Sequence, residues 1–165
     1  MDSKRHSLSL TYHKGYLYAI GGSDGFQKYK FSKYRAITTV ERFDLKKGQW
    51  ERYGHLCEAR VGHRSISLDS GLYVVGGWNG KHYVRAVERF DEAKGKFKVV
   101  MELKEGRAGF SICPENQNLN FMMMGGFNKR GSLQSCEKVD PISTKISKLK
   151  NLKECRSDGG CFLLF

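Results

Sequence analysis

Three pairs of glycines, each directly after a short apolar run, constrain the fold of this chain more than any other feature. A glutamate follows each pair inside a strand-like segment, and an aromatic or apolar residue stands nine positions further on. The same landmarks in the same order, three times over, define an internal repeat. The landmarks are Gly21, Gly22, Glu41 and Trp50, then Gly76, Gly77, Glu88 and Phe97, then Gly125, Gly126, Glu137 and Ile146.

An arginine marks the start of each repeat, at Arg5, Arg60, Arg107 and Arg156. These positions lie 47 to 55 residues apart. They predict a first repeat at residues 5–59, a second at 60–106, a third at 107–155 and the start of a fourth at 156–165.

Each repeat reads as four short strands joined by hairpins. In the second repeat the expected strands are Arg64–Leu68, Leu72–Gly76, Ala86–Phe90 and Phe97–Val100. In the first repeat, residues 7–10 supply the opening strand. Four antiparallel strands at this period form one blade of a β-propeller. The sequence therefore predicts an all-β chain, an arc of three four-stranded antiparallel blades plus the first strand of a fourth.

The predicted arc is incomplete, because closed propellers have about 4–8 blades. We expect an open ring belonging to a larger propeller, which makes this chain a fragment or a truncated product. The segment Cys161–Phe165 is apolar throughout and is expected to open the fourth blade. Such an unpaired strand edge predicts self-association of the chain on its own.

The glycine pairs, the Glu-Arg-Phe-Asp segments and the terminal arginines resemble the kelch repeat, over nearly the whole chain. They are most similar to the kelch-like branch, in which a kelch propeller follows BTB and BACK domains. The resemblance implies a protein-binding module, part of a substrate-recognition subunit of a cullin-based ubiquitin ligase that is recruited through domains outside this chain. The alternative it implies is an actin-binding, cytoskeletal kelch protein.

In kelch propellers the loops after the second and fourth strands of each blade open on one face, where a client peptide commonly docks. The resemblance assigns to that face the residues after the glycine pairs and at the repeat ends. The arginines have a second interpretation, in which they serve only to hold successive blades together. The candidate residues are Ser23, Arg60, Trp78, Asn79, Arg107, Phe127, Asn128 and Arg156.

The charge balance indicates what such a face would bind. The chain has 29 lysines and arginines against 17 acidic residues, a formal net charge of +12. We expect an acidic or phosphorylated peptide as its complement. The segment Gln27–Arg35 interleaves cations with aromatics, as single-stranded nucleic acid sites do. The same alternation fits a hairpin with one packed face, and no nucleic-acid module is present, so nucleic acid is the less favoured partner.

No motif predicts catalysis or a cofactor. The glycine pairs lack the Gly-Lys-Ser/Thr or Gly-x-Gly-x-x-Gly pattern of a phosphate cradle. No serine elbow or paired-histidine motif is present, and no copper site like that of the kelch-bladed galactose oxidase is matched. The three glutamates recur once per blade, which favours structural pairing over a shared acid-base site.

The five cysteines, at 57, 113, 136, 155 and 161, form no Cys-x-x-Cys pair. No metal site is expected from them, and they favour a reduced, cytoplasmic setting. No signal peptide is recognisable, and no apolar run approaches the ~20 residues of a transmembrane helix.

Overall fold

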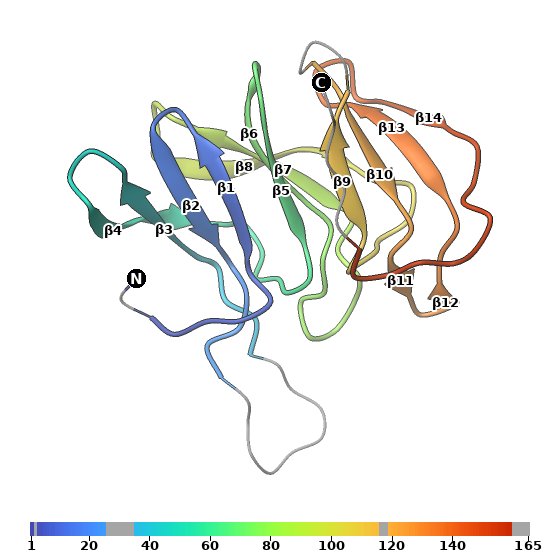
Figure 1. Ribbon diagram of the computed structural model, residues 1–165, viewed down its shortest axis with the longest axis horizontal. Helices are drawn as coiled ribbons and strands as arrows, with labels where there is room; N and C mark the ends of the chain where they lie inside the picture. The colour runs from blue at the N-terminus through green and yellow to red at the C-terminus, as the bar shows by residue number, and fades with distance from the viewer. Residues whose placement is uncertain (2, 26–34, 116–118, 160–165) are drawn as a thin grey trace.

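The computed structural model describes residues 1, 3–25, 35–115 and 119–159, and all the regular structure in them is β-strand. Three four-stranded antiparallel sheets follow one another along the chain and fan out as an open arc (Figure 1). We call them blades 1, 2 and 3. Within each blade the strands pair in chain order. The prediction of an all-β arc of three blades is confirmed.

The strands are short, with matching lengths in blades 1 and 2 and shorter strands in blade 3. Blade 1 contains β1 (Ser9–His13), β2 (Tyr16–Ile20), β3 (Thr39–Asp44) and β4 (Gln49–His55). Blade 2 contains β5 (Arg64–Leu68), β6 (Gly71–Val75), β7 (Ala86–Asp91) and β8 (Lys96–Glu102). Blade 3 contains β9 (Ser111–Pro114), β10 (Phe121–Met124), β13 (Cys136–Asp140) and β14 (Lys145–Lys148), and a hairpin of β11 (Phe127–Asn128) and β12 (Gly131–Ser132) lies between β10 and β13.

The strand ends differ slightly from those predicted. In blade 2 the second strand ends at Val75 and not at Gly76, whose φ of 62° cannot continue a strand. In blade 1 the first strand begins at Ser9 and not at Ser7, which has a φ of 53°. The carbonyl of Ser7 instead accepts a hydrogen bond from Gly62 N at 3.1 Å, at the junction with blade 2. The segment Cys161–Phe165 lies outside the described residues.

Tight turns join the strands within a blade. Lys14 and Gly15 link β1 to β2 in a two-residue turn with both φ values positive, the geometry that matches strand twist. At the end of β3, Asp44 Oδ1 accepts hydrogen bonds from the backbone of Lys46 (2.8 Å) and Lys47 (3.1 Å). The local sequence therefore specifies these connections.

The core lies between blades rather than within them. Alternate residues of β6 point to opposite neighbours: Leu72 and Val74 pack with the aromatic cluster shared with blade 1. Tyr73 and Val75 pack in the cluster shared with blade 3. Blade 2 is thus apolar on both faces, as a sheet buried between two layers requires.

The glycine pairs lie where neighbouring blades approach most closely. A Cβ on Gly77 would lie 2.9 Å from both the Val61 carbonyl oxygen and the His63 Cβ, and its φ is 104°. The amide of Gly77 also donates to the carbonyl of Arg107 at 2.8 Å. Glycine is required here both by conformation and by space.

Candidate functional site

The arginine that begins each repeat is paired with the glutamate in the third strand of the blade that it precedes. Neither Arg60 nor Arg107 has any exposed surface. Both are candidates for partner contact from the sequence, with the holding of successive blades as the other interpretation. Their complete burial among backbone carbonyls and a carboxylate favours the second interpretation. The three pairs are Arg5–Glu41, Arg60–Glu88 and Arg107–Glu137.

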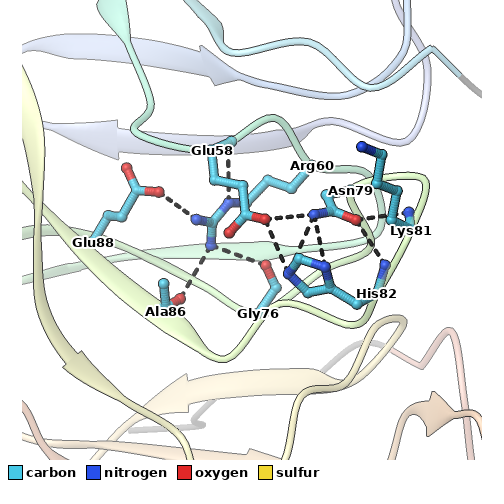
Figure 2. A network of polar contacts seen from close by, with 8 residues as sticks. All are labelled: Glu58, Arg60, Gly76, Asn79, Lys81, His82, Ala86 and Glu88. Carbon is cyan, nitrogen blue, oxygen red and sulfur yellow. Dashed lines mark hydrogen bonds and ion pairs between the residues drawn. The ribbon is translucent and has the colours of Figure 1, made fainter.

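Figure 2 shows the contacts of Arg60. Its guanidinium donates to the carbonyls of Gly76 (3.0 Å), Ala86 (3.1 Å) and Glu58 (3.2 Å). Its own carbonyl accepts from the amide of Gly22 at 2.9 Å. Arg60 therefore binds blade 2 through its side chain and blade 1 through its backbone, which supports the interpretation that these arginines hold blades together.

The charge of Arg60 is maintained despite complete burial. Desolvation lowers the pKa of Arg60, and the Glu88 carboxylate opposes that shift. Because a guanidinium starts far above neutral pH, Arg60 stays charged. The pair is thus a structural element within the blade.

Three further candidate positions also offer little to a partner or lie apart. Ser23 has no exposed surface and donates its hydroxyl to the Gly25 carbonyl at 3.3 Å. Asn128 is 7% exposed and caps the turn of blade 3 by accepting from the Arg130 amide. Arg156 is exposed, with Glu154 at 3.3 Å.

Asn79 organises the loop between β6 and β7 (Figure 2). Its side-chain oxygen accepts from the amides of Lys81 (2.7 Å) and His82 (2.8 Å), an arrangement that fixes a tight turn. Its amide nitrogen donates to Glu58, and His82 Nε2 lies 3.1 Å from the same carboxylate oxygen. The loop of blade 2 is therefore tied to the segment that enters the blade.

Beside this loop lies a groove of about 950 Å³. Its walls come from three segments: the loop between β6 and β7, the segment after β8, and the loop between β10 and β13. It opens between blades 2 and 3. It lies on the face formed by the loops after the second and fourth strands, which the resemblance to kelch propellers assigned to client docking. The lining residues are Trp78, Lys81, His82, Tyr83, Arg85, Lys104, Glu105, Gly106, Asn128, Lys129 and Arg130.

One wall of the groove is aromatic. The rings of Trp78 and Tyr83 lie 4.8 Å apart between centroids, tilted by 55°. Tyr83 in turn meets Phe127 edge-on at 6.0 Å. Of the predicted partner residues, Trp78 and the mostly buried Asn128 line the groove, with Asn79 and Phe127 directly beside them in the chain, while Ser23 and Arg156 are not among the lining residues.

The rest of the groove is strongly basic. Five cations line it, with Glu105 as the single carboxylate among the lining residues. Arg85 pairs with Glu102 at 3.3 Å, and Arg130 with Glu105 at 3.3 Å. The remaining three are the ammonium groups of Lys81, Lys104 and Lys129, which form no ion pair within the described part of the chain.

Sequence reasoning missed most of these residues, because the cations do not recur with the repeat. One signal was available: an acid stands two positions before the arginine that begins the next repeat, at Glu58, Glu105 and Glu154. In the structure Glu58 and Glu105 anchor the two loops that frame the groove.

His63 is a buried group that the sequence did not single out. It has no exposed surface, and its Nε2 lies 3.0 Å from the carbonyl oxygen of Ile20 in blade 1. Burial is the main cause that lowers the pKa of His63 to about 3. The ring is therefore neutral near pH 7 and its Nε2 donates to that carbonyl.

The three repeat glutamates do not converge on one site. Each pairs with its own arginine in a separate blade. Within the described ranges, no group of three or more His, Cys, Asp or Glu side chains is placed to hold a metal ion. The basic-aromatic segment Gln27–Arg35 lies, apart from Arg35, outside the described residues.

Among the described residues, no helix is long and apolar enough to cross a bilayer.

Comparison with known families gives a match over the first two blades. The model of the Kelch motif matches residues 4–55 and 59–104. These two stretches together cover more than half of the chain.

Curated proteins with similar sequences include Kelch-like protein 4 from Homo sapiens, 33% identical over 78 residues, which are 47% of this chain and 11% of that protein. Spermatocyte protein spe-26 from Caenorhabditis elegans is 28% identical over 92% of this chain and 27% of its own length. Kelch-like protein 41a from Danio rerio is 23% identical over 85% of this chain and 22% of its own. The chain thus spans about a quarter or less of the length of these relatives.

Among solved structures, that of YjhT superposes with a TM-score of 0.74, at 17% identity. The match covers 93% of this chain and 54% of that one. At this identity the likeness concerns the fold.

Proposed function

The chain belongs to the Kelch motif family of protein-binding repeats, and we propose that it is the client-binding part of a substrate-recognition subunit of a cullin-based ubiquitin ligase. The groove between blades 2 and 3 carries the proposal, since it joins an aromatic wall to a basic floor on the loop face. Aromatic and arginine side chains are the types that dominate protein interfaces.

The ligase role rests on the likeness to kelch-like proteins. Contact with the cullin would come from BTB and BACK domains outside the kelch repeats. This chain would supply client recognition, with binding and not catalysis as its task. The same proposal assigns it to the cytoplasm, which fluorescence microscopy of the tagged full-length protein tests.

The test is capture of partners by the full-length protein with the groove altered. We expect the combined variant Trp78→Ala/Lys104→Glu to lose client proteins while it retains the cullin, because only the client site is changed. The matched control is Tyr12→Ala/Lys96→Glu, which makes the same types of change at exposed positions outside the groove. Capture of the same clients by the groove variant would overturn the proposal for this site, and absence of any cullin would overturn the ligase role.

Actin binding is the alternative function that the family resemblance leaves open. Sedimentation of the full-length protein with filamentous actin tests it directly. The cytoskeletal role would be favoured if the wild type and the groove variant pellet equally with actin and no cullin is captured.

A further inference from the structure

The two unlike walls of the groove indicate the chemistry of its occupant. We infer, on the basis of the proposed function, that the groove binds an extended anionic peptide with one large apolar or aromatic side chain beside its acidic groups. The inference names the class of client and the residues that select it. Trp78 and Tyr83 would take the apolar side chain, and Lys81, Lys104 and Lys129 the acidic groups.

The charge in the groove is not neutralised by the protein itself. Of the five cations, only Arg85 and Arg130 have acidic partners among the described residues, at 3.3 Å each. Three exposed ammonium groups are left around one concave surface. Such a concentration of one sign of charge attracts a peptide of the opposite sign and steers its approach.

The apolar wall is already packed in place. The ring centroids of Trp78 and Tyr83 lie 4.8 Å apart, and Tyr83 also meets Phe127 edge-on at 6.0 Å. The backbone of Trp78 is held by two hydrogen bonds with Val61, both 2.9 Å. A ring fixed in this way binds an apolar side chain without a loss of its own freedom, which favours affinity.

The cationic loop is also held in position. Asn79 accepts from the amide of Lys81, and Glu58 binds both Asn79 and His82 (Figure 2). The pair of Arg130 with Glu105 links the loop of blade 3 to the segment after β8. The backbone of the two loops that carry Lys81 and Lys129 is thus held by the fold before any peptide arrives.

The shape of the groove favours a peptide over a nucleic acid. Trp78 and Tyr83 pack against each other, so they form one wall and not successive open platforms for stacked bases. Glu105 lines the groove beside the cations, and its carboxylate can accept hydrogen bonds from peptide amides, which a phosphodiester backbone does not offer. A volume of about 950 Å³ accommodates several peptide residues.

Fluorescence polarisation with short labelled peptides tests the inference on the whole chain. The probe is a run of glutamates around one tryptophan. Matched peptides replace the tryptophan by serine, the glutamates by glutamines, or two glutamates by phosphoserines, and an oligothymidylate serves as the nucleic acid. We expect binding of the first probe to weaken about tenfold when either the tryptophan or the acids are removed. Tighter binding of the phosphoserine peptide would identify the anionic groups as phosphates, and equal or weaker binding would identify them as carboxylates.

Two protein variants locate the binding. Lys104→Glu changes an exposed side chain and is expected to weaken binding of the acidic peptide about tenfold. Trp78→Ala is expected to weaken binding only of peptides that carry the tryptophan. Lys96→Glu, at the far end of β8, is the charge-matched control and should bind as the wild type does. Thermal unfolding of each variant establishes that the fold is retained.

The outcomes separate this inference from the proposed function. If the acidic peptide fails to bind while the groove variant still loses its clients in capture, the chemistry is wrong and the client site stands. If the peptide binds and client capture is unchanged, the groove is an anion site and the proposed function fails there. Preference for the oligothymidylate over every peptide would overturn the inference in favour of nucleic acid.

Discussion

The Arg60 guanidinium and the Glu88 carboxylate are ion-paired with no exposed surface on either side chain. They lie 28 residues apart in the chain. Glu88 also accepts from the backbone amide of Cys57 at 2.7 Å, so both of its oxygens are bonded. The carboxylate therefore ties the segment between blades 1 and 2 to the third strand of blade 2.

Removal of this arginine is predicted to be strongly destabilising. Arg60→Ala leaves the Glu88 charge buried without its partner, which costs about 3–5 kcal/mol of unfolding free energy. Urea denaturation measures it. Arg156→Ala is the in-chain control: its side chain is 71% exposed, so its midpoint should stay at the wild-type value. Equal midpoints for both variants would contradict the structural role of the buried pair.

A second prediction concerns glycine at the blade junction. Gly77 and Gly80 have similar φ values, 104° and 98°, but only Gly77 is enclosed, and nothing lies within 4 Å of a Cβ on Gly80. Gly80→Ala should therefore show only the cost of a left-handed residue, about 1–2 kcal/mol. Gly77→Ala should lose about 2 kcal/mol more, because its Cβ meets the Val61 carbonyl and His63. The check is the difference in unfolding free energy between the two variants.

Acid sensitivity is the third prediction, and it rests on His63. The pKa of His63 is about 3 in the folded chain against 6.5 for an ordinary histidine. Between these values the unfolded chain binds a proton that the folded chain does not, so the unfolding free energy falls as the pH falls below 6.5. The stability is fully present above 6.5.

In the His63→Phe variant the unfolding free energy should fall less steeply as the pH falls below 6.5. Phe110 occupies the matching place in blade 3, where it meets Gly126 as His63 meets Gly77. Denaturation between pH 6.5 and about pH 5 isolates the effect, since carboxylates with lowered pKa, such as Asp91, are still ionised there. Burial also lowers the pKa of His13, so a smaller slope is expected to persist. A slope unchanged by the substitution would contradict the assignment.

The fourth prediction orders the reactivity of the thiols. Cys155 is exposed, whereas Cys113 and Cys136 are buried. Cys57 is exposed as a residue, but its thiol donates to the Phe97 carbonyl, and desolvation with the Glu88 charge raises its pKa. Alkylation at neutral pH followed by peptide mass spectrometry should modify Cys155 before Cys57, and both before Cys113 and Cys136. Faster modification of Cys57 would show that the loop opens.

The repeat predicted the fold because each landmark performs a backbone task in every blade. Glycine is needed at position 77 because of its backbone conformation and the lack of space for a side chain. A glutamate is needed at position 88 because it pairs with the buried Arg60. Such requirements recur with the period of the chain and are visible in a single sequence. The strand ends could not be predicted as closely, because the repeat pattern does not show whether a residue such as Gly76 continues the strand or leaves it.

The groove could not be predicted in the same way. Lys104, Lys81 and Lys129 come from three loops that the repeat does not constrain, and their proximity depends on how blade 2 meets blade 3. The sequence left the role of the arginines open for a related reason. Spacing shows that Arg60 recurs with Glu88 but not that the two meet in the interior, where most long cations are absent.

The amide of Gly22 binds the carbonyl of Arg60, that of Gly77 binds Arg107, and that of Gly126 binds Arg156, so each bond reaches forward into the next repeat. A duplicated segment that begins at its arginine also contains the glutamate that pairs with it. The second glycine of its pair can then bind the carbonyl of the arginine that begins the following copy. Duplication of a whole repeat therefore leaves no charge orphaned, while duplication of part of one does. This arrangement gives kelch arrays a route to gain blades in evolution by tandem copying of one exchangeable module.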